Sequence, residues 1–329
     1  MNLILRTYSL FVSLWFAVNL FLQDSWWLPV GLDKFAEYFL AASIPLFLLA
    51  LLTRKSLTII LGIIPILVAS YFYLPLFIPE QQVALKPDSS PIRIATYNIW
   101  NHNTDLKRVV KLVNDINADV IAVQEMTNVQ KAEFVERMSV TYPYYYVSKP
   151  IYGGTTALFS KLVLSDIQEL DFDIDRPAVL ANVTHEGELI TVVSAHLNPS
   201  FWAYHDQPLQ EIPGNYHQYI KDQNTQALVI IDALKLRLES SASVLACDCN
   251  SQETASTNKH LRSYFKDTFR TLGYQFGTPA EQKFKFERKL SHIDYIWFSG
   301  NVHPSAIYRA KEAAGSDHAP IVADFYISK

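Results

Sequence analysis

The sequence predicts an α/β domain preceded by an amino-terminal helical membrane anchor. Three observations support this prediction: long apolar stretches are confined to the first 79 residues, strand and helix patterns alternate in the remainder, and polar residues close several of the strand patterns. Of the 329 residues, 50% are hydrophobic, which is a high fraction for a soluble protein. The excess of apolar residues lies at the front of the chain.

Three apolar stretches form the predicted anchor, at residues 3–22, 35–52 and 56–78. Each is close to the roughly 20 residues that a helix needs to cross a bilayer, so we expect about three helices within residues 1–79. The first stretch alone also fits a cleaved signal peptide, although no small-residue cleavage site follows it. The second carries Glu37 and Pro45, so its alternative is a surface or re-entrant segment.

Loop charges predict the orientation of this anchor. Arg54 and Lys55 join the second and third stretches, whereas the loop at residues 23–34 carries one lysine against two aspartates. Because basic loops tend to stay in the cytoplasm, we expect the amino terminus inside and the chain beyond about residue 80 outside. The predicted location is the cell membrane, with an extracytoplasmic catalytic domain.

A polar, proline-punctuated linker is predicted at residues 80–91, followed by a single domain at residues 92–329. Without the four basic and three acidic residues of the anchor, 24 basic and 29 acidic residues remain. This mildly acidic balance does not favour binding of long nucleic acids, although it does not exclude them.

The domain begins with a strand–helix–strand pattern. Residues 92–100 alternate as a strand, apolar residues recur at helical spacing over 106–116, and 119–125 form an apolar run typical of a buried strand. Further strands are expected at 155–160, 178–183, 189–196, 243–250 and 294–298, and in the apolar run after Pro320, with a helix at about 224–239.

Eight polar residues stand at or near the ends of these strand patterns, where the edge of a sheet would gather them. They are Asn98, Glu125, His196, Asp248, Asn250, Asp294, Asp317 and His318. Together they supply oxygen ligands for a hard metal, two histidines, a candidate base and carboxamide donors, which suits hydrolysis of a phosphate ester. The alternatives are local: Asn98 only caps a turn, Asp294 pairs with nearby backbone, or Asp317 and His318 form a solvated turn.

The same residues carry a family resemblance. The ordered motifs are Tyr97-Asn98, Gln124-Glu125, His196-Leu197, Asp248-x-Asn250, Ile293-Asp294-Tyr295 and Ser316-Asp317-His318. This order resembles the endonuclease/exonuclease/phosphatase superfamily, which includes pancreatic-type deoxyribonucleases, apurinic endonucleases, neutral sphingomyelinases and inositol polyphosphate phosphatases. The resemblance covers about residues 92–327 and suggests a membrane-anchored member of bacterial type.

The resemblance implies a four-layer α/β sandwich with two packed mixed β-sheets and a magnesium site at one edge. Glu125 would be the principal metal ligand, with Asn98 beside it and Asp317 as a further ligand; Mn²⁺ is the alternative to Mg²⁺. Asp248 would align or deprotonate the attacking water, and Asn250 would donate to the phosphate. Asp294 would hold His318, and His196 would face the leaving-group oxygen. The residues alone leave the identity of the general base open.

Two cysteines depart from the family pattern, because Cys247 and Cys249 flank Asp248 where glycine and an aromatic residue are usual. A bridge between residues two apart on an extended strand would be strained. We therefore expect two buried small hydrophobic residues rather than a redox or metal-binding pair.

The predicted function is that of a membrane-anchored, metal-dependent hydrolase of a phosphodiester or phosphomonoester, with a small or lipid-linked substrate. An extracytoplasmic nuclease acting on DNA or RNA is the alternative. Three roles are open for the aromatic loop at residues 201–205: contact with lipid, stacking on a nucleic-acid base, or ordinary packing against the rest of the domain. A non-catalytic binding module is the third possibility, and it would be expected to lack some of the eight polar residues.

Overall fold

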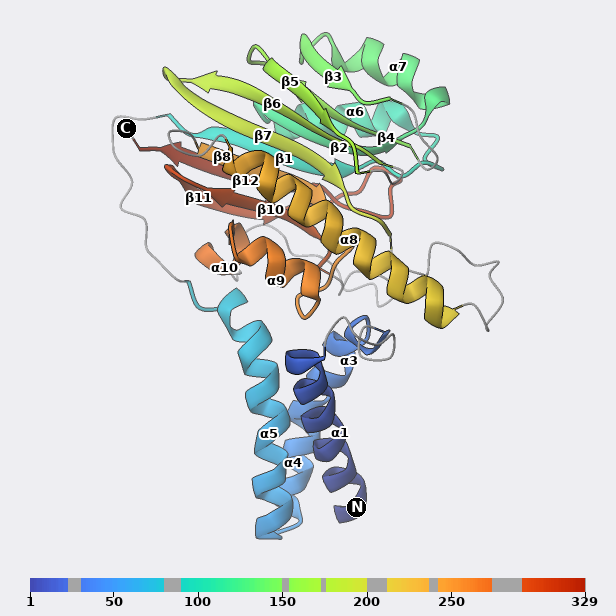
Figure 1. The fold of residues 1–329 in the computed structure, drawn as a ribbon, viewed down its shortest axis with the longest axis vertical. Coiled ribbons are helices and arrows are strands. Elements are labelled where there is room, and N and C mark those ends of the chain that lie inside the picture. Colours follow the sequence, from blue (N-terminus) through green and yellow to red (C-terminus); the bar gives the residue numbers. More distant parts are fainter. Residues whose placement is uncertain are drawn as a thin grey trace.

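The computed structural model describes residues 1–22, 31–79, 90–149, 154–172, 176–199, 212–236, 242–273 and 292–328. Nearly all of the predicted linker and the aromatic loop at 201–205 lie outside these ranges. Figure 1 shows a bundle of amino-terminal helices standing below a layered α/β domain.

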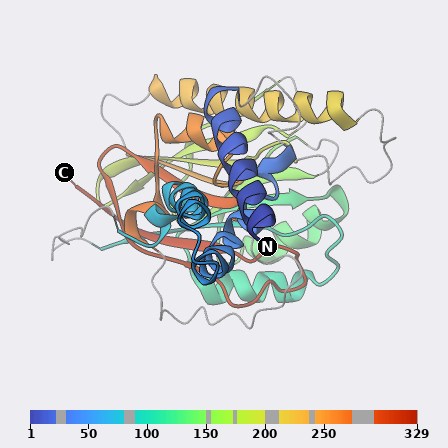
Figure 2. The same ribbon diagram turned by 90° about the horizontal axis from the view of Figure 1, so that it is seen from below.

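The bundle consists of α1 (Asn2–Phe21), α3 (Ala36–Ala41), α4 (Ser43–Leu52) and α5 (Ser56–Tyr73), followed by the short 3₁₀ turn η1 (Leu74–Leu76). Among the described residues, α1 and the stretch Ser56–Leu76 are long and apolar enough to cross a membrane, by length and composition. The stretch Ala36–Leu52 is shorter. Seen from below in Figure 2, α1 and α5 lie side by side beneath the α/β domain.

Two six-stranded sheets form the centre of the α/β domain, and each mixes parallel and antiparallel pairs. The first has the order β11-β12-β1-β2-β4-β3 and the second the order β5-β6-β7-β8-β10-β9. The first sheet contains β1 (Ile92–Asn98), β2 (Val120–Met126), β3 (Tyr144–Val147), β4 (Thr155–Ser160), β11 (Val302–Arg309) and β12 (Ile321–Ile327). The second contains β5 (Ser165–Leu170), β6 (Ala178–His185), β7 (Glu188–His196), β8 (Ala242–Asp248), β9 (Lys266–Asp267) and β10 (Asp294–Ser299).

Three apolar layers hold these sheets and their helices together. Ile94, Val192 and Ile296 belong to the cluster between the two sheets. Helix α6 (Leu106–Ile116), joined by α7 (Asn128–Met138), buries its apolar side on the outer face of the first sheet. Helix α8 (Ile212–Lys235), joined by α9 (Ser256–Arg262), lies on the outer side of the second sheet. The short α10 (Thr268–Leu272) instead contributes Phe269 to the cluster between the sheets. The predicted α/β sandwich with two packed mixed sheets is confirmed.

Helix α6 illustrates why the sequence forms these layers. Leu106, Val109, Val113 and Ile116 recur at helical spacing and are all buried. The Asp105 side chain caps the helix by accepting a hydrogen bond from the backbone N–H of Arg108. The amphipathic pattern therefore sets which side of α6 faces the sheet, and the cap sets where the helix begins.

The predicted helix at 224–239 begins earlier in the structure, since α8 starts at Ile212. Polar side chains, including Gln223, Asn224 and Gln226, interrupt the apolar pattern near the expected start. All three are buried and bond to other parts of the chain: Gln223 and Gln226 to the loop at Asn198, and Asn224 to Ser256 at the start of α9. Apolar periodicity alone could not distinguish such buried amides from a loop.

Candidate active site

Strand register brings the predicted polar residues to one edge of the sandwich. The parallel pair β1 and β2 sets Asn98 opposite Gln124, next to Glu125. In the second sheet, β7 and β8 set His196 opposite Asp248, and the antiparallel neighbour β10 sets Asp294 opposite Asp248. The Asn98 amide donates to Asp248 Oδ2 at 2.9 Å, which links the ends of the two sheets.

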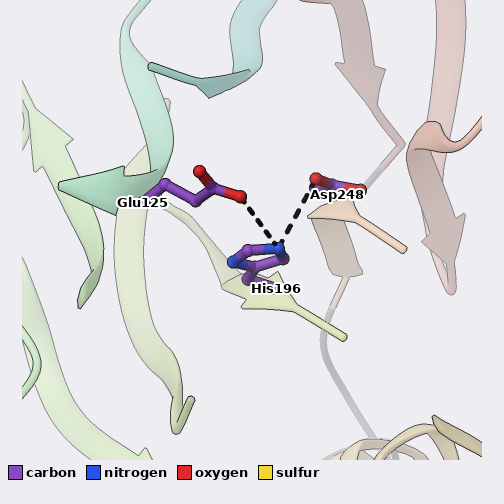
Figure 3. Close-up of side chains that lie close together, drawn as sticks. All are labelled: Glu125, His196 and Asp248. Atoms are coloured by element: carbon purple, nitrogen blue, oxygen red, sulfur yellow. Dashed lines mark ion pairs between the residues drawn. The ribbon is translucent and has the colours of Figure 1, made fainter. Parts of the chain in front are cut away.

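Glu125, His196 and Asp248 converge at this edge, as Figure 3 shows. Nε2 of His196 lies 3.6 Å from Glu125 Oε1 and 3.6 Å from Asp248 Oδ2. One ligand atom from each of the three residues lies within 4.8 Å of the others. Two carboxylates and an imidazole at this separation can hold a divalent metal ion.

The backbone at Glu125 is bent so that its side chain enters the site. Glu125 has a φ of 61°, and the pairing of β2 with β4 is irregular between Val123 and Met126. Gly154 packs against this bend so closely that a Cβ there would lie 2.7 Å from the backbone of Glu125. Any side chain at position 154 would therefore collide with the backbone of Glu125. The Glu125 carboxylate is further oriented by the backbone N–H of Asn101, which donates to Oε2 at 3.2 Å.

Asp248 also belongs to a second group, together with Asp294 and His318. One ligand atom from each of these three residues lies within 4.8 Å of the others. Nδ1 of His318 is 2.9 Å from Asp294 Oδ2, and Nε2 of His318 is 3.7 Å from Asp248 Oδ2. Ser316 fixes the turn that carries the histidine: its hydroxyl donates to the Asn98 carbonyl at 2.7 Å and accepts from the His318 backbone N–H at 3.0 Å.

The two histidines have opposite protonation tendencies. Burial lowers the pKa of His196 well below its ordinary value, and the nearby positive charges of Arg176 and His318 act in the same direction. Burial also lowers the pKa of His318, but the carboxylates of Asp294 and Asp248 outweigh it, so this pKa lies well above its ordinary value. Near neutral pH, His196 is thus a neutral imidazole and His318 an imidazolium.

Burial raises the pKa of Asp248 to about 7, and the negative charges of Asp294 and Glu125 add to this effect. The His318 charge and the hydrogen bond from Asn98 oppose it. A carboxyl group whose proton is lost near neutral pH is suited to accept a proton from water.

Three predicted residues are not members of these two carboxylate–histidine groups: Asn98, which bonds to Asp248 as described above, Asn250 and Asp317. Asn250 donates from its backbone N–H to Asp248 Oδ1 at 3.0 Å and from its side-chain amide to the Leu197 carbonyl at 3.0 Å. The Asp317 side chain is exposed and influences the site through the pKa of His318. The catalytic and ligand roles of these residues remain predictions.

Arg176 was not predicted from the sequence. One of its guanidinium nitrogens lies 3.0 Å from Nδ1 and 2.7 Å from Nε2 of His196. Extending the antiparallel register of β6 and β7 brings neighbouring Pro177 level with His196. The hairpin pattern contained this signal, because the start of one strand of a hairpin lies beside the end of the other.

Two amides of α8 were also missed, and they hold the loops behind the site. Gln226 accepts from the backbone N–H of Asn198 at 2.7 Å, while Gln223 donates to the carbonyls of Asn198 and Asn250. Their partners are backbone groups, so no side-chain pattern in the sequence could have identified them.

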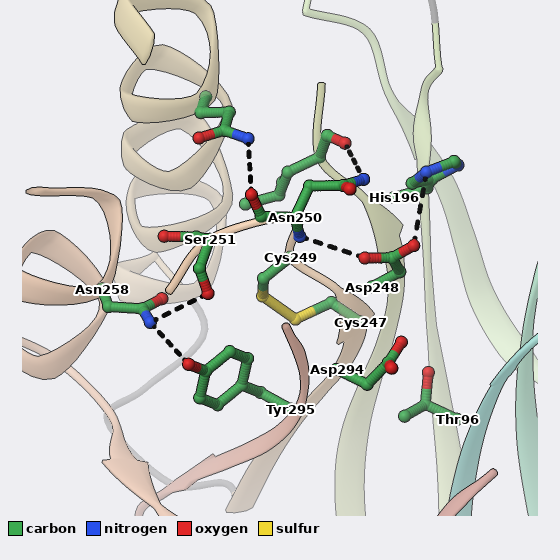
Figure 4. The surroundings of a disulfide bond; sticks show 12 residues. Thr96, His196, Cys247, Asp248, Cys249, Asn250, Ser251, Asn258, Asp294 and Tyr295 are labelled. Carbon is green, nitrogen blue, oxygen red and sulfur yellow. Dashed lines mark hydrogen bonds and ion pairs between the residues drawn. A yellow bond between two sulfur atoms is a disulfide. The ribbon is translucent and has the colours of Figure 1, made fainter. Parts of the chain in front are cut away.

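The expectation that Cys247 and Cys249 are free small hydrophobic residues is wrong, because the structure joins them by a disulfide (Figure 4). Their Cα atoms are 5.2 Å apart, within the usual range for a bridge. Cys247 lies in β8, whereas Cys249 follows its last residue, Asp248, so the two cysteines do not lie on one continuous strand. The expected burial is correct, since neither cysteine is exposed. The bridge thus brackets Asp248.

Comparisons with known proteins match this architecture. The sequence profile of the Endonuclease/Exonuclease/phosphatase family matches residues 95–318. No curated protein sequence matches the chain.

Among solved structures, the endonuclease/exonuclease/phosphatase from Bacteroides vulgatus is 17% identical, with a TM-score of 0.54 over 73% of this chain and 100% of its own. D. rerio TDP2 complexed with single strand DNA product is 16% identical, with a TM-score of 0.54 over 72% and 99%. Sphingomyelinase C from Streptomyces griseocarneus is 12% identical, with a TM-score of 0.50 over 72% and 99%. At these identities the structures share the fold alone, whereas the profile spans most of the chain, and this protein therefore belongs to the endonuclease/exonuclease/phosphatase family of phosphate-ester hydrolases.

Proposed function

We propose that this protein is a membrane-anchored, divalent-metal-dependent phosphoesterase that hydrolyses a phosphodiester or phosphomonoester of a small or lipid-linked substrate. The observation that carries the proposal is the position of Asp248, which is shared by two carboxylate–histidine groups. One group contains a neutral imidazole and the other an imidazolium. This arrangement provides metal ligands, a proton acceptor and a cationic donor within one small site.

The proposed metal ligands are Glu125 and Asn98, with Asp317 as a further ligand. The proposed ion is Mg²⁺, with Mn²⁺ as the alternative, because carboxylate and carboxamide oxygens suit both. When bound, the ion would polarise the phosphate ester and offset the negative charge of the substrate.

The remaining catalytic roles are proposed for side chains of this protein. Asp248 orients the attacking water and accepts its proton. The His318 imidazolium, held by Asp294, donates a hydrogen bond to a non-bridging phosphate oxygen, where negative charge builds up in the transition state. The amide of Asn250 adds a second donor to the phosphate, and His196 faces the leaving-group oxygen.

An extracytoplasmic membrane location is supported by two observations. Helices α1 and α5 have the length and composition of membrane-crossing segments. With the amino terminus inside, the catalytic domain lies outside if the shorter apolar stretch Ala36–Leu52 crosses as well, which makes three crossings. A disulfide such as that between Cys247 and Cys249 also persists more readily outside the cytoplasm.

A lipid-linked phosphodiester is favoured by the anchor and by the shared fold with sphingomyelinase C. The second candidate is a nuclease, because TDP2 of the same fold was solved with a single strand DNA product. The excess of acidic residues beyond the anchor favours the lipid-linked substrate.

The test is hydrolysis of bis(4-nitrophenyl) phosphate and 4-nitrophenyl phosphate by the full chain in detergent micelles. Activity should vanish in chelator and return with added Mg²⁺ or Mn²⁺. Glu125→Gln should raise the metal concentration needed for half-maximal rate. A panel of phospholipids, sphingomyelin and single-stranded DNA then separates the two substrate classes.

The exposed Glu133→Gln variant is the matched control and should require the same metal concentration as the wild type. Undiminished hydrolysis in chelator would overturn the metal-dependent mechanism. Hydrolysis of DNA without hydrolysis of any lipid would favour the nuclease.

A further inference from the structure

The amino-terminal helices contact the catalytic domain beside its active site. Asn19, close to the end of α1, donates to the Thr254 carbonyl at 3.3 Å and accepts from the Lys259 ammonium at 3.3 Å. The same Asn19 amide donates to Asp33 at 2.8 Å, which fixes the segment that follows α1. Residues 31–36 are thereby held against the chain that continues from β8.

Lys34 extends from this segment to the loop after Asp248. Its ammonium donates to the Asn250 carbonyl at 2.9 Å, and Gln223 donates to the same oxygen at 3.2 Å. Asn250 has a φ of 48°, an uncommon conformation for a residue with a side chain. Two donors therefore hold the carbonyl of a residue whose backbone is in a sparsely populated conformation.

The Asn250 peptide is connected directly to the proposed base. Its backbone N–H donates to Asp248 Oδ1 at 3.0 Å, and its side-chain amide holds the Leu197 carbonyl next to His196 (Figure 4). Rotation of Asn250 would therefore disturb the orientation of the Asp248 carboxylate and the chain beside His196.

A second contact holds the other strand of the site. The Glu37 carboxylate accepts a hydrogen bond from the backbone of His292, two residues before Asp294. The loop after β8 and the chain before β10 are joined by the Cys249 N–H and the Ile293 carbonyl at 2.9 Å. Residues 34–37 thus contact the backbone two residues from each member of the Asp248–Asp294 pair.

Charge also connects Lys34 to the site. Burial lowers the pKa of Lys34 to about 8, and the carboxylates of Asp33, Asp248 and Glu37 act in the opposite direction. At neutral pH the ammonium is therefore mostly charged, and its charge partly offsets the negative charge around Asp248.

We propose that Lys34 is a positioning residue of the active site, supplied by the amino-terminal helical segment, which holds the Asn250 peptide so that Asp248 is aligned with the attacking water. This inference rests on the proposed phosphoesterase function. It makes the helical segment a part of the catalytic apparatus as well as an anchor, since a change in how that segment packs would change the rate.

The experiment compares Lys34→Met with Lys34→Arg in the full chain, with bis(4-nitrophenyl) phosphate as substrate. Methionine keeps most of the side-chain stem but removes the donor and the charge, whereas arginine keeps both. Loss of a charged hydrogen bond predicts a kcat about ten- to a hundredfold lower in Lys34→Met. KM and the half-maximal metal concentration should stay within about threefold of the wild type, and Lys34→Arg should recover most of the rate.

Lys55→Met, in the exposed loop between α4 and α5, is the matched control and should behave as the wild type. Melting temperatures of all variants identify a folding defect, and Lys34→Gln replaces Lys34→Met if the latter does not fold. A Lys34→Met kcat equal to that of the wild type would overturn the inference. Equal losses in the folded Met and Arg variants would do so as well. An inactive wild type would instead refute the proposed function.

Discussion

His318 and Asp294 face each other across the edge of the sandwich, with Nδ1 of the imidazole 2.9 Å from Oδ2 of the carboxylate. The aspartate begins β10 of the second sheet, and the histidine stands on the turn before β12 of the first. The two therefore meet only because the sheets pack face to face. A histidine held in this way acts together with its partner.

We expect this pair to behave as a unit in mutational analysis. Asp294→Asn should lose much of the activity that His318→Ala loses, because the amide cannot stabilise the imidazolium. The double variant should be little worse than His318→Ala. Steady-state kinetics of the three variants measures the coupling, and additive losses would show that the two residues contribute independently.

His196 should affect the leaving group selectively. Its Nε2 lies between Glu125 and Asp248, and burial together with Arg176 and His318 keeps the imidazole neutral. As a hydrogen-bond donor to a departing oxygen it would contribute about ten- to a hundredfold for a poor leaving group. We therefore expect His196→Ala to be more damaging on an alkyl phosphodiester than on a nitrophenyl ester.

His318→Ala is the matched comparison and should lose similar activity on both esters, because His318 is proposed to contact a non-bridging oxygen. Equal losses on both esters for His196→Ala would reject its leaving-group role and leave it as a metal or phosphate ligand.

The proposed topology predicts where a carboxy-terminal reporter functions. An alkaline phosphatase fused after Lys329, which is active only outside the cytoplasm, should be active. The same reporter inserted at the Arg54-Lys55 loop should be inactive, because basic loops stay in the cytoplasm. The converse pattern of activities would reverse the orientation of the anchor.

Asp267 should make stability depend on pH. Burial, with the Glu253 charge adding to it, raises the pKa of this carboxyl to about 7. Between its ordinary value of 3.8 and about 7 the folded state therefore binds more protons than the unfolded state, so stability falls as pH rises through this window and is level above it. Oδ1 caps α10 through the Phe269 N–H, while Oδ2 has no hydrogen-bond partner in the described structure.

Asp267→Asn keeps an oxygen for that cap and removes the titration. The stability of the wild type should fall as pH rises from 5 to 8, whereas that of the variant should not. The difference in free energy of unfolding between variant and wild type should therefore be about 2 kcal/mol larger at pH 8 than at pH 5. Melting temperatures of both proteins at the two pH values measure this difference. Asp232→Asn, on the exposed side of α8, is the control and should show no such change. A wild type and variant with the same pH dependence would contradict the raised pKa.

Local sequence was sufficient to predict most of the helices and strands and the polar residues at the ends of the strands. Alternation and apolar runs located β1, β2, β7 and β8, because burial of one or both faces of a strand leaves a periodic signal. Asn98, Glu125, His196 and Asp248 were identified because a polar residue that ends an apolar strand lies at the edge of its sheet. Together with the order of the motifs, these positions were enough to recognise the family.

Tertiary structure decided the contacts that cross between elements. The meeting of His318 with Asp294, and of Asn98 with Asp248, depends on how the two sheets pack, which no local pattern records. Lys34 lies 216 residues before its partner Asn250, and that partner is a backbone carbonyl, which is the same group in every residue. The sequence by itself determined which side chains reach the edge of the sheets, because burial is periodic along the chain. Only the tertiary structure determined their partners, because hydrogen bonds and charges act over a few ångströms in space, whatever the separation in sequence.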